Sequence, residues 1–232
     1  MRCDLCKRGC VGSLPLFRGL PLTDIQDIQR LIAHRSFTKG ETVVREGEQL
    51  TGIYIVESGQ AKAYAQSKTG GEQVLRLLQV GDFYGELSLI SVMEAPSTVQ
   101  ALTDLRLCTI SSEALKSYLL SHPTAALSIL GALSARLRRA EQLSEQLGLL
   151  DSRQRVAALL LNLNERQGRS TDHGSSIHLH LNRNELASMI GLRQETLSRC
   201  LTEFRQAGWI ETEGHKLLYI LNEPALQELA RL

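Results

Sequence analysis

Residues 183–207 constrain the fold more than any other stretch, because apolar residues recur at helical spacing on both sides of a single glycine. Leu186, Ala187 and Ile190 form one apolar helix face, and Gly191 follows directly, where a first helix must end and turn. A second helix then carries an apolar face formed by Leu192, Leu197, Leu201 and Phe204. Two short helices joined by a glycine-containing turn are typical of a helix-turn-helix.

The outer face of the second predicted helix is polar. It carries Glu195, Ser198, Arg199 and Thr202 at positions i, i+3, i+4 and i+7, with Arg193 just before the helix. Carboxylate, hydroxyl and guanidinium groups at this spacing are suited to reading base edges in the major groove of DNA. An ordinary helical hairpin with a solvated face is the alternative. Short apolar runs at 209–210 and 217–220 favour DNA reading, because they predict the β-hairpin, or wing, of a winged helix-turn-helix.

Short β-rich runs separated by glycine occupy the region from about 36 to 110. These runs lie at 42–44, 52–56, 61–65, 73–78 and 105–110, and turn signals such as Lys39-Gly40 and Ser58-Gly59 separate them. Strands spaced by roughly ten residues with turns between them predict a compact β-roll or barrel.

A long helical pattern follows the β-rich region. It begins at Pro123 and reaches about Leu150, and no strong break interrupts it before Gly148. Its narrow stripe alternates by three and four residues through Leu130, Leu133, Leu137, Ala140, Ser144 and Leu147. Such a stripe predicts a homodimeric coiled coil, and a core helix packed against its own barrel is the alternative. A second helical pattern at 152–167 leads into the DNA-reading region.

Bulk composition excludes several classes of protein. The 232 residues are 43% hydrophobic and 22% charged, with a formal net charge of +1, as is usual for a globular protein. No window approaches 18 uninterrupted apolar residues, and the polar start lacks the apolar core of a signal peptide, so we expect no membrane partner and a cytoplasmic location. The histidines have no metal or triad spacing and no phosphate loop is present, so we do not expect an enzyme.

The cysteines are unevenly distributed. Three of the five, Cys3, Cys6 and Cys10, fall in the first ten residues as C-x2-C-x3-C, and the others are Cys108 and Cys200. An odd number of cysteines argues against a structural disulfide framework. The density at the N-terminus therefore indicates another chemical role.

The whole pattern resembles the CRP/FNR family of bacterial transcription regulators. GDFYGELSLI at 81–90 is similar to the family's β-roll signature, and QETLSR at 194–199 is similar to the FNR-type recognition helix. The resemblance implies an α+β fold with an N-terminal β-roll of the cyclic-nucleotide-binding jelly-roll type, a long dimerisation helix and a C-terminal winged helix-turn-helix. The expected domains are a cysteine-containing arm at 1–20, a sensor β-roll at 21–121, a dimerisation helix at 122–150 and a DNA-binding domain at 151–232.

The resemblance also implies what is bound. In the FNR branch an E-x-x-S-R pattern, here Glu195, Ser198 and Arg199, reads TTGA-type half-sites of palindromic double-stranded DNA, and RNA polymerase is a further partner. Cyclic-AMP-binding members clamp the phosphate with an Arg-Ser pair, for which this chain has Pro96 and Ser97. Proline has no guanidinium, so we do not expect a cyclic nucleotide.

The cysteines resemble those of FNR-type oxygen sensors. By that resemblance Cys3, Cys6, Cys10 and Cys108 hold a [4Fe–4S] cluster, which needs four thiolates. Cys200 is then a small apolar residue of the recognition helix. A zinc site of the same four thiolates, a thiol–disulfide switch, and haem or another small effector in the β-roll remain as alternatives.

Overall fold

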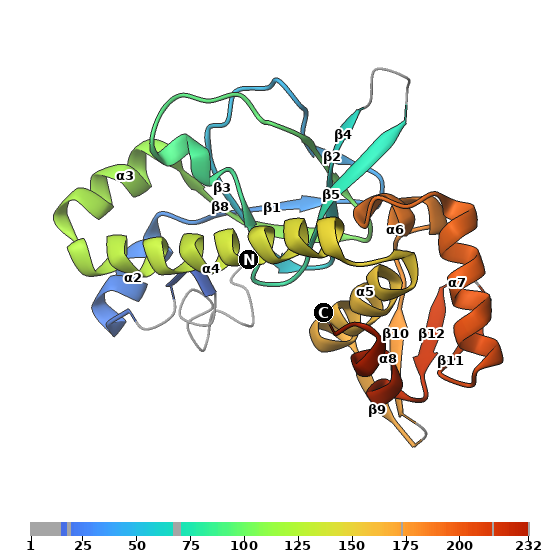
Figure 1. Ribbon diagram of the computed structural model, residues 1–232. Helices are drawn as coiled ribbons and strands as arrows, with labels where there is room; N and C mark the ends of the chain where they lie inside the picture. The colour runs from blue at the N-terminus through green and yellow to red at the C-terminus, as the bar shows by residue number, and fades with distance from the viewer. Residues whose placement is uncertain (1–14, 18–19, 67–70, 173, 215, 232) are drawn as a thin grey trace. The chain divides into compact units, whose positions relative to one another are not determined.

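A computed structural model describes residues 15–17, 20–66, 71–172, 174–214 and 216–231 (Figure 1). The chain divides into two compact units, with a boundary in the long helix between Arg139 and Ala140. No helix of the described residues is long and apolar enough to cross a membrane.

The N-terminal unit is a β-roll built from two four-stranded sheets. One sheet has the order β1-β8-β3-β6 and the other the order β2-β7-β4-β5. The strands are β1 (Ala33–Phe37), β2 (Thr42–Val44), β3 (Gly52–Ser58), β4 (Ala61–Gln66), β5 (Glu72–Leu78), β6 (Phe83–Tyr84), β7 (Thr98–Ala101) and β8 (Leu105–Ser111). The neighbouring strands β1, β3 and β8 pair antiparallel. The α+β class and the β-roll predicted from the sequence are therefore confirmed.

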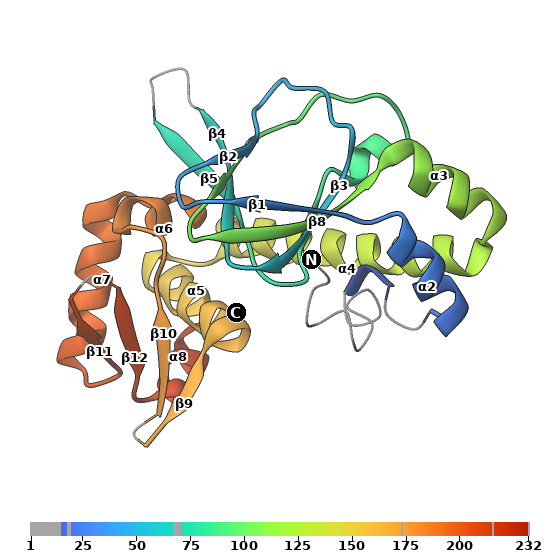
Figure 2. The ribbon, with the colours of Figure 1, turned by 180° about the vertical axis from the view of Figure 1, so that it is seen from behind.

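Strand β8 separates two apolar cores. Leu105 and Leu107 point into the core between the sheets, whereas Cys108 and Ile110 belong to a second core on the opposite face. Helical segments cover that opposite face, namely η2 (Pro15–Phe17), α2 (Leu22–Arg30), α3 (Ser112–Ser121) and the start of α4 (Pro123–Leu149). Figure 2 shows α2, α3 and the start of α4 at the same end of β1 and β8, on the right of the view. Strand β8 accordingly buries Leu105 and Leu107 on one face and Cys108 and Ile110 on the other.

The segment η2 belongs to the β-roll core. Leu16 and Phe17 are fully buried, and they lie in the same core cluster as Cys108. The sequence prediction assigned residues 1–20 to the arm, but the structure shows that the end of this segment packs as part of the sensor unit. The predicted domain limits stay a prediction; α2 begins at Leu22 and α3 ends at Ser121.

The C-terminal unit is a winged helix-turn-helix, as predicted. Its helices are α5 (Ser152–Gln167), α6 (Arg183–Met189), α7 (Gln194–Gln206) and α8 (Glu223–Leu229). Its sheet has the order β11-β12-β10-β9, from β9 (Arg169–Thr171), β10 (Gly174–His178), β11 (Ile210–Glu213) and β12 (Leu217–Ile220). Helix α5 begins with a capping box between Asp151 and Gln154, which explains why the helical pattern restarts there after α4.

All five β-runs and the helix at 152–167 predicted from the sequence are present. The elements that the sequence prediction missed include β1, β6, β7, β9, α2 and α8. Strand β6 has only two residues, and β1 exposes four of its five residues, so neither shows the alternation of apolar and polar residues that marks a strand.

The turn between α6 and α7 depends on Gly191. Its φ of +64° is left-handed, and the backbone N–H of Leu192 donates to the carbonyl of Ala187 at 3.0 Å while that of Gly191 donates to Ser188 at 3.2 Å. These two bonds are those of a Schellman motif, which ends a helix and satisfies its last carbonyls.

We predict that Gly191→Ala destabilises the C-terminal unit by about 1 kcal/mol, because an L-residue is strained in the left-handed region. A Cβ at this position would meet its nearest neighbours at 3.7 Å and 3.8 Å, so the cost comes from the backbone and not from a clash. Urea unfolding followed by the fluorescence of Trp209, the single tryptophan, measures this unit. Gly191→Asn should cost less than Gly191→Ala, and equal stability of all three proteins would contradict the argument.

Candidate functional site

The polar face predicted on the second helix of the motif is exposed in α7. Glu195, Ser198, Arg199 and Thr202 are all exposed, while the opposite face of the same helix buries Leu197, Cys200, Leu201 and Phe204. Arg193 is the exposed residue that precedes the first turn of α7. The helix therefore presents a carboxylate, a hydroxyl and a guanidinium together to solvent, which is the arrangement needed for contact with base edges.

Contacts within the C-terminal unit fix the orientation of this face. Arg153 of α5 forms an ion pair with Glu203 of α7 at 3.2 Å, and the rings of Phe204 and Trp209 lie 5.4 Å apart below the helix. Helix α6 starts with a capping box, in which Asn182 and Glu185 exchange hydrogen bonds of 2.9 Å and 2.7 Å. The two helices of the motif are thus held by contacts that leave the polar face of α7 free of packing.

Thr202 and Arg183 are less available for DNA contact than an exposed polar side chain would be. The hydroxyl of Thr202 donates to the carbonyl of Ser198 at 2.9 Å, so its proton is used inside the helix and its methyl and lone pair remain for a partner. Arg183 is half-buried, and burial lowers the pKa of its guanidinium. Of the local arginines, Arg193, Arg199 and Arg205 are therefore the exposed ones.

Cys200 behaves as a structural residue. It lies on the buried face of α7, and burial, with the nearby Glu203 carboxylate, raises the pKa of its thiol. A thiol with a raised pKa is a poor nucleophile and a poor metal ligand. This environment agrees with the expectation that Cys200 fills space in the helix.

Helix α4 has one packed face and one exposed apolar stripe. Ala125 and Ile129 are buried in the β-roll core, and Leu133 packs partly against that core. Leu130 and Leu137 are exposed, at 57% and 59%, whereas Leu147 is half-buried and Ala140 is exposed. The alternative of a core helix packed against its own β-roll therefore holds for the face with Ala125 and Ile129. The predicted dimer seam stays a prediction, with Leu133 at its inner edge.

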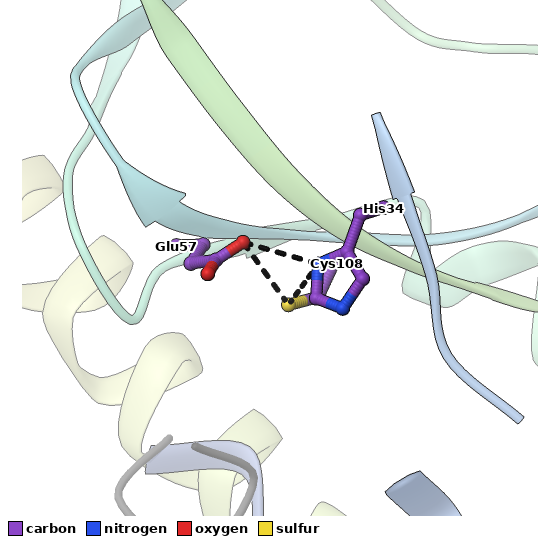
Figure 3. Close-up of side chains that lie close together, drawn as sticks. All are labelled: His34, Glu57 and Cys108. Atoms are coloured by element: carbon purple, nitrogen blue, oxygen red, sulfur yellow. Dashed lines mark hydrogen bonds and ion pairs between the residues drawn. The ribbon is translucent and has the colours of Figure 1, made fainter. Parts of the chain in front are cut away.

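The β-roll places three ligating side chains together (Figure 3). Cys108 is buried in the middle of β8, with His34 Nδ1 at 3.8 Å and Glu57 Oε2 at 3.9 Å from its Sγ. His34 Nδ1 lies 3.1 Å from Glu57 Oε2, and Arg106 Nε lies 3.8 Å from the same oxygen. The sequence pattern indicated Cys108 but gave no sign of His34 and Glu57. Cys3, Cys6 and Cys10 lie outside the described residues.

The position of the family's effector pocket holds groups that pair with one another. Glu86, at the start of η3 (Glu86–Leu89), forms an ion pair with Arg136 of α4. The hydroxyl of Tyr84 donates to the carbonyl of Ser97 at 2.9 Å and lies 3.1 Å from the Ser97 hydroxyl, whereas Pro96 is exposed. Burial lowers the pKa of the neighbouring Arg76 to about 10. Ser97 thus contacts Tyr84 and Glu86 contacts Arg136, and the expectation that no cyclic nucleotide binds stays a prediction.

Comparison with known proteins identifies the family. The model of the cyclic nucleotide-binding domain matches residues 34–122, and that of the Crp-like helix-turn-helix domain matches residues 154–229. The chain is 30% identical to a CRP-like cAMP-activated global transcriptional regulator of Mycobacterium tuberculosis, over 88% of this chain and 91% of that protein. The chain belongs to the CRP/FNR family of transcription regulators. It is accordingly a DNA-binding regulator, and this family is not enzymatic.

Two further similarities support the assignment. The chain is 29% identical to the transcriptional activator protein FnrA of Stutzerimonas stutzeri, over 97% of this chain and 92% of that protein. The solved structure of FixK2 from Bradyrhizobium japonicum has the same fold, with a TM-score of 0.77 at 23% identity, over 87% of this chain and 98% of that one. CRP/FNR regulators bind DNA as dimers, so the exposed stripe of α4 is the surface to test for dimerisation.

We predict that Arg199→Ala weakens binding to the preferred half-site by about 1–3 kcal/mol and relaxes its sequence preference, because a guanidinium on the outer face of α7 is suited to bidentate contact with guanine. Arg205→Ala removes the same charge from the last turn of α7 and should change affinity equally for all sequences. Fluorescence anisotropy with matched and mutated DNA sites measures both effects. Full affinity and full preference in Arg199→Ala would refute the assignment.

We predict that Leu137→Glu gives monomers that fail to bind a palindromic site, because it places a charge in the exposed stripe of α4. Leu137 is exposed in the single chain, so the substitution should leave the fold intact. Leu120→Glu, on the exposed surface of α3, is the matched control and should leave the dimer unchanged. Analytical ultracentrifugation distinguishes the two states, and an unchanged dimer in Leu137→Glu would exclude this seam.

Proposed function

We propose that this regulator senses oxygen or redox state through a [4Fe–4S] cluster held by Cys3, Cys6, Cys10 and Cys108. It is a homodimer that binds palindromic DNA with TTGA-type half-sites and acts with RNA polymerase. The cytoplasmic location predicted from the sequence is part of this proposal.

One observation carries the sensing proposal: Cys108 lies on the β-roll face on which residues 15–17 pack. Leu16, Phe17 and Cys108 belong to one buried cluster, so the end of the arm is anchored beside the fourth thiol. Cys10 precedes Pro15 by five residues, and five residues span at most about 17 Å. Chain length alone therefore keeps this cysteine within a short reach of the anchored segment.

The groups around Cys108 act on its thiolate form in opposite directions. Burial alone disfavours a thiolate, and the Glu57 carboxylate at 3.9 Å adds to that cost. The Arg106 guanidinium lies 3.8 Å from the same carboxylate and offsets part of its charge, and His34 Nδ1 lies 3.1 Å from it. When bound, a [4Fe–4S] cluster supplies an oxygen-labile link between four thiolates.

The packing of α4 offers a route from the arm to the DNA-reading dimer. Ala125 and Ile129 of α4 lie in the same core cluster as Phe17 and Cys108. An arm tied to β8 would stabilise one packing of the α4 base, and an untied arm would release it. A ligand that binds one of two packings shifts the population toward that packing, which is how metal state would change DNA affinity.

Similarity to FnrA supports the FNR branch, as do Glu195, Ser198 and Arg199 on the exposed face of α7. In this assignment Arg199 contacts guanine, Glu195 accepts from cytosine N4, and Ser198 contacts the neighbouring base pair. Arg193 and Thr202 flank these three side chains on the same surface.

Anaerobically purified protein should absorb broadly in the visible range, contain iron and sulfide, and lose colour in air. Replacing Cys108 by Ser should lower iron and sulfide and abolish anaerobic DNA binding, whereas Cys200→Ser should change neither. A full cluster in Cys108→Ser would refute the four-thiolate model. Zinc without iron would favour the structural zinc site. A disulfide that controls DNA binding would favour the thiol switch, and a Soret band would favour haem.

A further inference from the structure

Three ligating atoms from three neighbouring strands meet on the outer face of the β1-β8-β3 sheet. Antiparallel pairing places His34 and Ile55 opposite Cys108, on its two sides, and Glu57 follows Ile55 by two residues on the same face of β3. Figure 3 shows the imidazole, the carboxylate and the sulfur turned toward one another. Among the described residues, this is the one group of histidine, cysteine and acidic side chains close enough to share a metal ion.

The separations match one face of a tetrahedral metal site. Bonds of about 2.0 Å to nitrogen and oxygen and about 2.3 Å to sulfur would separate nitrogen from oxygen by about 3.3 Å and sulfur from either by about 3.5 Å. The observed separations are 3.1 Å between His34 Nδ1 and Glu57 Oε2, 3.8 Å between Sγ and Nδ1, and 3.9 Å between Sγ and Oε2. Movements of a few tenths of an ångström would therefore place all three atoms around one cation.

Burial and charge also favour a cation at this point. The Glu57 side chain is 3% exposed and Cys108 is buried in an apolar core, while the His34 side chain is 36% exposed and leaves a path from solvent. A buried carboxylate is costly unless a positive charge compensates it. Arg106 Nε lies 3.8 Å from the same carboxylate oxygen, so this oxygen already attracts a positive charge.

We propose that His34 Nδ1, Glu57 Oε2 and Cys108 Sγ form a mononuclear site for a divalent cation such as Zn²⁺, Co²⁺ or Fe²⁺. Imidazole, carboxylate and thiolate together suit these borderline metals rather than Mg²⁺ or Ca²⁺. Three protein ligands leave a fourth tetrahedral position for water. The site goes beyond the iron–sulfur proposal and does not rest on it. Both sites use the Cys108 thiolate, so one chain can hold either the cluster or the single cation, but not both at once.

The test uses the full chain with Cys3, Cys6 and Cys10 all replaced by Ser, so that the arm thiolates are absent. This variant, treated with chelator and then desalted, is titrated with Co²⁺ under anaerobic conditions. We expect one Co²⁺ per chain and a thiolate-to-cobalt charge-transfer band in the near ultraviolet. Adding Cys108→Ser should remove this band, and adding His34→Ala or Glu57→Gln should weaken Co²⁺ affinity by about tenfold or more, since each removes one ligand.

Matched controls show whether the band arises from these three ligands. Cys200→Ser in the same background removes the other described cysteine and should leave the band unchanged, and Arg106→Ala should leave it present. His34 lies on the edge strand β1, so His34→Ala is expected to keep the fold, which far-ultraviolet circular dichroism checks.

Two results would overturn the proposal: a folded triple-serine variant that binds no Co²⁺, which would make the group an ordinary hydrogen-bonded triad, or a band that survives Cys108→Ser. The iron–sulfur proposal is judged separately, from iron and sulfide in the unaltered chain. Failure of one therefore does not imply failure of the other.

Discussion

The burial of strand β8 on both faces is the constraint on which the sensor unit depends. One face of β8 packs between the two sheets through Leu105 and Leu107, and the other packs under helical segments through Cys108 and Ile110. Apolar burial of this kind stabilises a domain by roughly 25 cal/mol for each Å² removed from water. The same packing holds the Cys108 thiol at a fixed place, in one core with η2 and the base of α4 and paired through β1 and β3.

This arrangement joins Cys108, η2 and the base of α4 in one core. The apolar cluster that contains Cys108 also contains Phe17 of η2 and Ala125 and Ile129 of α4. Protein interiors are close-packed, so a change at one member of such a cluster is felt by its neighbours. On its other side, α4 exposes Leu130 and Leu137. Pairing with a second chain would cover these two side chains. In the proposed function, this helix would have one face for the sensor and one for a second chain.

The C-terminal unit differs from the β-roll in that the polar face of α7 is kept free of packing. Local devices hold its helices: capping boxes at the starts of α5 and α6, the left-handed Gly191 after α6, and the Arg153–Glu203 ion pair. Each device acts over a short distance and leaves Glu195, Ser198 and Arg199 exposed. A rigid helix with an unengaged polar face is what recognition in the major groove requires.

The sequence by itself determined the parts of this protein that depend on local spacing. The helical periodicity around Gly191, the wing, five strands of the roll and the length of α4 follow from residues close together in the chain, and the structure confirms them. Motifs at 81–90 and 194–199 were sufficient to indicate the family. Short or exposed elements such as β6 and β1 were missed, because two residues or a polar edge strand show no periodicity.

Tertiary structure alone decided which residues surround Cys108. His34 lies 74 residues from it and Glu57 lies 51 residues from it along the chain, and only the register of β1, β8 and β3 brings their side chains together. The sequence likewise could not predict which face of α4 is packed and which is exposed. Leu133 and Leu137 follow the same spacing, and only the fold shows that Leu133 contacts the β-roll while Leu137 is exposed. Periodicity tells which residues share a face of an element; what that face contacts depends on strand pairing and packing between distant segments.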